Sequence, residues 1–149
     1  MKGIDISEWD VSNGINFNSM FYNTLNFNCD VSKWNVSSGK TFFSMFHGCT
    51  KFNCDLSNWD VSSGESFSKM FYNCRSLDCD LSNWNVSKGE SFSGMFEYNT
   101  NFNNDLSKWD VSRGRKFGYM LANCKHFNCD LSNWDVSNAD DLRYMFYNC

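Results

Sequence analysis

Six tryptophans recur at a fixed interval of 25 residues along this chain of 149 residues, and a methionine follows each of them at a constant distance. The tryptophans are Trp9, Trp34, Trp59, Trp84, Trp109 and Trp134. No insertion or deletion interrupts the spacing, which is typical of a protein built from stacked structural repeats. The interval therefore predicts a single domain, residues 1–149, made of six rungs. Their predicted bounds are 1–24, 25–49, 50–74, 75–99, 100–124 and 125–149.

The third rung contains two different apolar periods. Leu56, Trp59 and Val61 have the spacing L-x-x-L-x-L, and Trp59 and Val61 alternate with polar residues, as in a half-buried strand. Beyond Gly64, apolar residues fall at i, i+3, i+4 and i+7, which forms one face of a short helix. These residues are Phe67, Met70, Phe71 and Cys74. The sequence predicts an α/β repeat solenoid of the leucine-rich-repeat type, in which each rung contributes one short parallel β-strand and one short helix.

The aromatic and methionine columns of such a stack have the spacing that burial requires, which favours a role in the core over a role as a ligand-stacking platform. We expect Trp59 to stack between Trp34 and Trp84, and the phenylalanines and methionines to stack in the same way. None of the six tryptophans is therefore predicted to bind a ligand.

The string F-N-x-D-L-S-x-W-D-V-S followed by M-F resembles the BspA-like leucine-rich-repeat surface proteins. It stands at residues 52–62 with Met70-Phe71 and at residues 127–137 with Met145-Phe146, and the resemblance covers nearly the whole chain. The resemblance implies a right-handed solenoid at a cell surface or in the secreted fraction, a role in adhesion or molecular recognition, and no catalytic residues. Because the chain shows no signal peptide, a location in a virion or inside a cell is the alternative.

Polar side chains alternate with the buried tryptophans and valines, and they form a polar strip on the predicted outer face. Its candidate binding residues are Asp10, Lys33, Asn35, Asn58, Asp60, Asn83, Asn85, Lys108, Asp110, Asn133 and Asp135. This polar strip is interpreted as a solvated face, with a repeating surface for a protein or glycan as the alternative. The positions after the strand vary more from rung to rung and are the better candidates for specific recognition. They include Lys40-Thr41, Glu65-Ser66, Arg115-Lys116 and Asp140-Asp141.

One aspartate per rung forms a further column, comprising Asp5, Asp30, Asp55, Asp80, Asp105 and Asp130. An aspartate at a fixed turn position most often accepts hydrogen bonds from nearby backbone N–H groups. Calcium binding, which also uses carboxylate oxygens, is the alternative for this column.

The eight cysteines fall in two columns, and three pairs are five residues apart: Cys49 and Cys54, Cys74 and Cys79, Cys124 and Cys129. Joint replacement by Asn99 and Asn104 in one rung indicates that the two columns touch. Buried free thiols are the first interpretation. Disulfides within the three pairs are the second, and a metal site is disfavoured because the spacing is not C-x-x-C.

A net charge of −4 disfavours nucleic-acid binding, and the chain has no apolar stretch long enough to span a membrane. His47 and His126 are separated by more than three 25-residue repeats, too far to share a proton relay or a metal. We therefore expect a non-catalytic recognition or adhesion module that binds a protein or glycan, with no cofactor and no metal. The alternative is an architectural subunit of a larger assembly, such as a virion, with contacts through uncapped termini.

Overall fold

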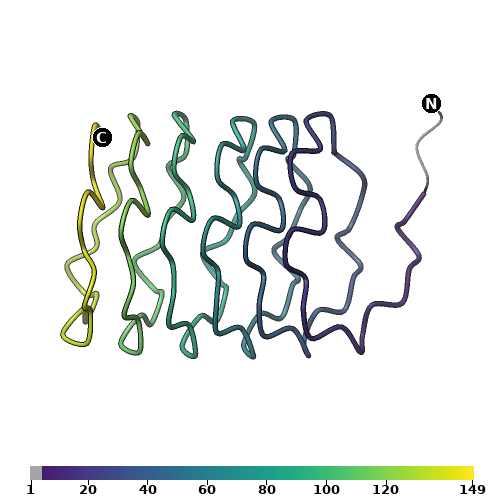
Figure 1. The fold of residues 1–149 in the computed structure, drawn as a ribbon, viewed down its shortest axis with the longest axis horizontal. Coiled ribbons are helices and arrows are strands. Elements are labelled where there is room, and N and C mark those ends of the chain that lie inside the picture. Colours follow the sequence, from purple (N-terminus) through teal and green to yellow (C-terminus); the bar gives the residue numbers. More distant parts are fainter. Residues whose placement is uncertain (1–4) are drawn as a thin grey trace.

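The structure, a computed structural model, describes residues 5–149, which wind into a stack of similar turns (Figure 1). Equivalent residues of successive turns form isolated parallel bridges at the 25-residue interval of the repeat. The bridged residues are Asn16, Thr41, Ser66, Ser91, Lys116 and Asp141. Each rung therefore lies on the next, with the first and last rungs at opposite ends of the stack.

The prediction of one helix and one β-strand per rung is wrong. Residues 5–149 contain no helix, and their strand pairing is confined to the isolated bridges. In the segment predicted as a helix, Lys69 and Asn73 have φ angles of 54° and 55°, and left-handed residues interrupt a right-handed helix. The Met70 N–H instead donates to the Phe67 carbonyl at 3.1 Å and closes a tight turn. Successive tight turns thus reproduce the apolar spacing of a helix.

The segment predicted as a strand also consists of turns. The Trp59 N–H donates to the Leu56 carbonyl at 3.0 Å, and the Gly64 N–H donates to the Val61 carbonyl at 2.8 Å. Within the described part of the chain, no backbone hydrogen bond joins residues 54–64 to a neighbouring rung. The alternation in the sequence is therefore an alternation of burial only, since Trp59 and Val61 point into the core.

A ladder of backbone hydrogen bonds joins the rungs through the segment that was predicted as a helix. In the third rung the N–H groups of four alternate residues donate to carbonyls of the fourth rung, at 2.8 to 3.0 Å. The donors are Phe67, Lys69, Phe71 and Asn73, and the acceptors are Ser91, Ser93, Met95 and Glu97. The same four bonds recur at every junction between rungs, always from the earlier rung to the later one.

Side chains join the rungs on the opposite side of the turn. From Trp34 to Trp134, each indole Nε1 donates to the backbone carbonyl of the residue 28 positions earlier, at 2.9 to 3.0 Å. The tryptophan column therefore supplies hydrogen bonds between rungs in the segment, residues 54–64 in the third rung, where no backbone hydrogen bond joins the described rungs.

The interior is filled by columns of aromatic and aliphatic side chains, as the sequence predicts. The Phe67 ring stacks between Phe42 and Phe92, with ring centroids 5.6 Å apart in both pairs. Trp59 is 3 % exposed and lies parallel to Trp84, at a centroid distance of 6.5 Å. Trp9, by contrast, is 50 % exposed, since it has a stacking partner in Trp34 on one side only among the described residues.

Candidate functional site

The polar strip predicted from the sequence is exposed along its whole length. Six of its eleven side chains accept a hydrogen bond from a serine N–H two residues later and so stabilise local turns. All eleven candidate residues are exposed. The Asp60 carboxylate accepts the Ser62 N–H at 3.0 Å, and the Asn35 side chain accepts the Ser37 N–H at 3.1 Å. The Ser62 side chain and then its backbone N–H lower the pKa of Asp60. Asp and Asn are interchangeable here because each can accept this hydrogen bond.

The aspartate column has the same turn geometry. Asp55, for example, accepts the Ser57 N–H at 2.9 Å, and this hydrogen bond is the main reason that the pKa of Asp55 is lowered. Within residues 5–149, no group of three or more His, Cys, Asp or Glu side chains is arranged to hold a metal ion. The structure therefore offers a turn-stabilising role for the aspartates and no calcium cluster in that region.

All eight cysteines are free, and several of them form hydrogen bonds between rungs. The Cys74 Sγ donates to the Phe46 carbonyl at 2.9 Å, and Asn99 donates through Nδ2 to the Phe71 carbonyl at 2.6 Å. The column that contains Cys74 and Asn99 therefore requires a small side chain that can donate a hydrogen bond. The prediction of inert buried thiols did not include this role. Burial raises the pKa of Cys124 to about 12, so its thiol stays protonated near neutral pH.

The other cysteine column provides acceptors. The Val31 N–H lies 3.3 Å from the Cys54 Sγ, and the Leu81 N–H donates to the Asn104 Oδ1 at 2.9 Å. A thiol and an amide are interchangeable in both columns because each group can donate and accept. This exchange explains why Asn99 and Asn104 can occupy cysteine positions.

The variable positions after the predicted strand flank the parallel bridges and carry ion pairs between rungs. Lys40 pairs with Glu65 at 3.3 Å, and Arg115 pairs with Asp140 at 3.0 Å. All four side chains are about half exposed, so these pairs are solvent-screened and contribute little to stability.

A second exposed surface was missed by the sequence analysis. The six tyrosines of the chain and His47 form two groups of contacting rings that border one depression, and we call this surface the tyrosine face. Its residues are Tyr22, His47, Tyr72, Tyr98, Tyr119, Tyr144 and Tyr147. His47 stacks between Tyr22 and Tyr72, at centroid distances of 4.5 and 4.3 Å, and Tyr119 stacks on Tyr144 at 5.0 Å.

A depression of about 390 Å³ lies between the two groups of tyrosines, with Tyr72 on one side and Tyr119 on the other. Two glycines make room for it. A Cβ on Gly118 would lie 2.9 Å from the Asp141 carboxylate, and a Cβ on Gly94 would lie 3.2 Å from Glu97. Gly94 also has a φ angle of 61°, which a glycine adopts without strain.

The depression contains charges of both signs. Lys69 and Arg143 contribute positive charge, while Glu97 and Asp141 contribute negative charge. Arg143 lies 3.3 Å from Asp141. Burial raises the pKa of Glu97, and the neighbouring Lys69 partly opposes that shift. Such a site can bind groups of either charge and can form hydrogen bonds through the tyrosine hydroxyls.

Sequence reasoning missed the tyrosine face because it treated the residues around each Met-Phe pair as a helix. The sequence did contain a signal for this surface, since every tyrosine stands within three residues of the methionine that recurs in each rung. Only the turn geometry shows that these side chains point outward while the methionine and the next residue point inward.

Two stretches of the chain, residues 1–97 and 86–149, match the family described as Mycoplasma protein of unknown function, DUF285. The chain belongs to this family. DUF285 membership is consistent with the BspA-like resemblance and assigns no activity or partner. No curated protein and no solved structure matches this DUF285 chain. Its residues 5–149 also contain no helix with the length and apolar character needed to cross a membrane.

Proposed function

We propose that this chain is a non-catalytic recognition module that binds a protein partner through the tyrosine face. The observation that carries the proposal is the arrangement of the tyrosines in two groups of contacting rings, with a charged depression between Tyr72 of one group and Tyr119 of the other. Tyrosine and arginine are enriched at protein interfaces, because they combine a large contact area with a polar end. The polar strip lacks such anchors and is the weaker candidate.

The rigidity of the stack supports this proposal. Tyr22, His47 and Tyr72 are held in a continuous aromatic pile, and the His47 and Tyr72 carbonyls accept hydrogen bonds of the backbone ladder. Side chains that are already ordered lose little conformational entropy on binding. The depression supplies a central cavity in which a partner's charged side chain could be paired.

The test uses a displayed random-peptide library and a glycan array as probes for the wild-type chain. Peptides selected on the wild type should lose at least about tenfold in affinity on the double variant Tyr72→Ser, Tyr119→Ser, which corresponds to the removal of interface anchors. The matched control is Asn58→Ala, Asn83→Ala on the polar strip, which should bind as the wild type does.

Three outcomes would overturn the proposal. The peptides could depend on Asn58 and Asn83 instead of the tyrosines, or no peptide could bind the wild type. Specific binding on the glycan array alone would replace a protein partner with a glycan.

A further inference from the structure

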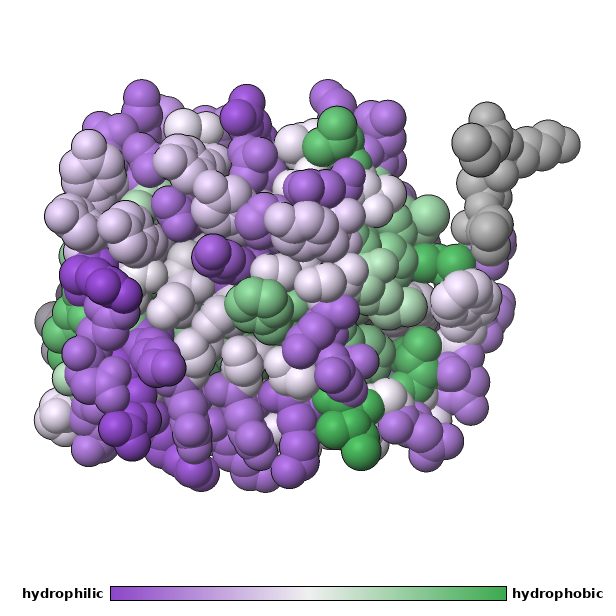
Figure 2. All heavy atoms as spheres, viewed as in Figure 1, coloured by the Kyte–Doolittle hydropathy of each residue, from purple (hydrophilic) through white to green (hydrophobic). Residues whose placement is uncertain are grey.

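The chain is acidic, and its charge favours a basic partner. Its net charge is −4, and hydrophilic residues cover most of the face of the molecule that Figure 2 shows. Complementary charge steers a partner toward a surface and suppresses wrong partners. The charged depression beside the tyrosines is therefore the place to look for a site that holds a basic side chain.

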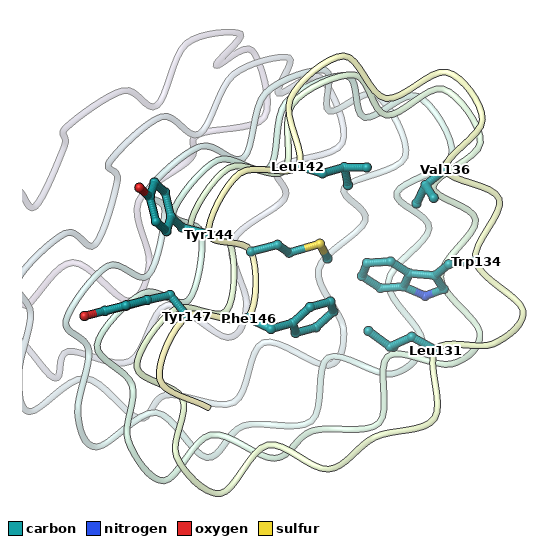
Figure 3. Close-up of a pocket in the computed structure, with 8 residues that line it drawn as sticks. Leu131, Trp134, Val136, Leu142, Tyr144, Phe146 and Tyr147 are labelled. Atoms are coloured by element: carbon teal, nitrogen blue, oxygen red, sulfur yellow. The ribbon is translucent and has the colours of Figure 1, made fainter.

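One column of outward-facing residues has a gap at this depression. Its members in four successive rungs are Lys69, Gly94, Tyr119 and Tyr144, and the first three line the depression. Tyr119 stacks on Tyr144 at a centroid distance of 5.0 Å, whereas within residues 5–149 no ring of the preceding rung stacks on Tyr119. Figure 3 shows Tyr144 pointing outward, away from Trp134. The missing side chain at Gly94 therefore leaves a space beside the exposed Tyr119 ring, which we call the Gly94 gap.

The backbone conformation of this column does not by itself call for a glycine. The φ angle of Gly94 is 61°, and the equivalent residues Ser44, Lys69 and Tyr119 have φ angles of 53°, 54° and 59°. Residues with side chains thus occupy the same left-handed position in other rungs. The main effect of glycine in the fourth rung is the space that it leaves.

The Glu97 carboxylate borders the Gly94 gap. A Cβ on Gly94 would lie 3.2 Å from the Glu97 Oε2. Glu97 is half-buried, and it forms no ion pair with any of residues 5–149, whereas Asp141 is paired with Arg143 at 3.3 Å. A partly desolvated carboxylate is stabilised in its charged form by a cation brought close to it.

The stem of Lys69 forms the wall of the gap that lies opposite Tyr119. A Cβ on Gly94 would lie 3.2 Å from the Lys69 Cγ and 3.8 Å from its Cε. The Gly94 gap is thus bounded by an aromatic ring, an aliphatic stem and a carboxylate. The Lys69 ammonium opposes the entry of a second cation, and this opposition is used as a test below.

We propose that the Gly94 gap receives an arginine side chain of the protein partner, an inference that rests on the proposed function and names its central contact. A guanidinium is planar and stacks on aromatic faces, so it extends the stack of Tyr119 and Tyr144 into the gap. Its fork of N–H donors pairs with a carboxylate, which Glu97 supplies at the edge of the gap. A lysine ammonium offers neither the plane nor the fork.

Peptides selected on the wild-type chain from the displayed library test this inference. Those that lose binding to the double variant Tyr72→Ser, Tyr119→Ser should contain an arginine. Replacing that arginine with citrulline, which is planar but neutral, should lower the affinity at least about tenfold, as for a charged interface anchor. Glu97→Gln should weaken the arginine peptide by a similar factor and leave the citrulline peptide unchanged. Isothermal titration calorimetry of the four combinations forms a double-mutant cycle.

Three further variants of the chain give effects of different sign. Lys69→Met removes the opposing charge and keeps an aliphatic stem, so the affinity for the arginine peptide should rise by about threefold, as for a solvent-screened charge pair. Gly94→Tyr fills the gap with the residue type of the next rung and should weaken binding at least about tenfold. Glu65→Gln is the matched control, because it changes the net charge as Glu97→Gln does but lies outside the depression. It should bind as the wild type does, and near-ultraviolet circular dichroism verifies that each variant is folded.

The outcomes separate this inference from the proposed function. Tyrosine-dependent peptides that lack arginine, or that tolerate citrulline or lysine in its place, would overturn the inference and leave the proposed function intact. A required acidic residue, with binding that weakens in Lys69→Met, would assign the Gly94 gap to an anion and also overturn it. If no selected peptide depends on the tyrosines, the proposed function and the inference both fail.

Discussion

The indole Nε1 of Trp59 donates a hydrogen bond to the backbone carbonyl of Val31 in the preceding rung, at 2.9 Å. No backbone hydrogen bond crosses between rungs within residues 54–64, so this side-chain bond is a principal polar link on that side of the stack. Its repetition from rung to rung explains why tryptophan, with its single N–H donor, recurs at this position.

Trp59→Phe removes this donor and keeps an aromatic ring in the stack. We expect the free energy of unfolding to fall by about 2–4 kcal/mol, from the lost hydrogen bond and the smaller ring. Urea denaturation followed by circular dichroism measures the change. Trp9→Phe is the control. It should lower the free energy of unfolding by less, because the Trp9 indole has no acceptor within the described residues and its ring is half exposed. Equal losses for the two variants would contradict the role of the hydrogen bond.

Gly64→Ala should destabilise the fold by about 1–3 kcal/mol through overpacking. An added Cβ would lie 2.3 Å from the Phe67 ring and 2.9 Å from the Val61 carbonyl oxygen. The last rung has Ala139 at the glycine position, and there a leucine replaces the phenylalanine.

Thermal unfolding of Gly64→Ala, Phe67→Leu and the double variant forms a double-mutant cycle. The double variant should be more stable than the sum of the two single losses predicts, because the leucine leaves room for the Cβ. Strictly additive losses would show that the contact with Phe67 is not the cause.

Asn99 is 1 % exposed, and its Oδ1 has no hydrogen-bond partner. Asn99→Asp places a carboxylate beside the Phe71 carbonyl oxygen, and we expect a loss of about 3–5 kcal/mol at neutral pH, as for other unpaired buried charges. Asn99→Cys restores the residue type of the neighbouring rungs and should stay within about 1 kcal/mol of the wild type, because the thiol can donate to the same carbonyl. Urea midpoints at pH 7 distinguish the two. A tolerated aspartate would show that the site is open to water.

Stability should fall as the pH rises above 9. Burial raises the pKa of Cys49 to about 11 and that of Cys79 to about 12, whereas the ordinary value of a thiol is 9.0. Below pH 9 the thiols are protonated in both the folded and the unfolded chain, so they make no difference to stability. Between pH 9 and their raised pKa values the unfolded chain loses protons that the folded chain keeps, which favours unfolding.

Urea midpoints at pH 7.5 and at an alkaline pH within that window measure this effect. The variant Cys49→Ser, Cys74→Ser, Cys79→Ser, Cys124→Ser should lose most of the thiol contribution to the alkaline fall, because burial raises the pKa of all four thiols and serine does not titrate in this range. An equal fall in the variant would assign the effect to other groups.

Mass spectrometry of the chain after alkylation in denaturant, without reductant, should find eight modified cysteines, since all eight are free in the structure. Native-state alkylation should reach Cys149 before Cys74, because Cys149 is exposed and Cys74 is buried. Two fewer modified cysteines, both belonging to one pair such as Cys74 and Cys79, would restore the disulfide alternative for that pair.

The sequence alone determined the repeat length, the register of the stack and the buried columns. The unbroken interval between Trp9 and Trp134 could be satisfied only by equivalent residues meeting in successive rungs. The structure confirms the aromatic stacks and shows parallel bridges between equivalent residues, although these bridges lie outside the predicted strands. Burial could be predicted because it depends on side-chain chemistry and spacing, both of which are visible in the sequence.

Only the tertiary structure decided the backbone path and, with it, the exposed surfaces. An i, i+3, i+4 pattern is shared by a helix and by a run of tight turns, and local sequence does not distinguish them. Residues such as Lys69 and Asn73 adopt left-handed conformations because their N–H groups then reach carbonyls of the next rung. Those hydrogen bonds exist only once the rungs are stacked, so the turns and the tyrosine face both depend on contacts 24 or more residues away in the sequence.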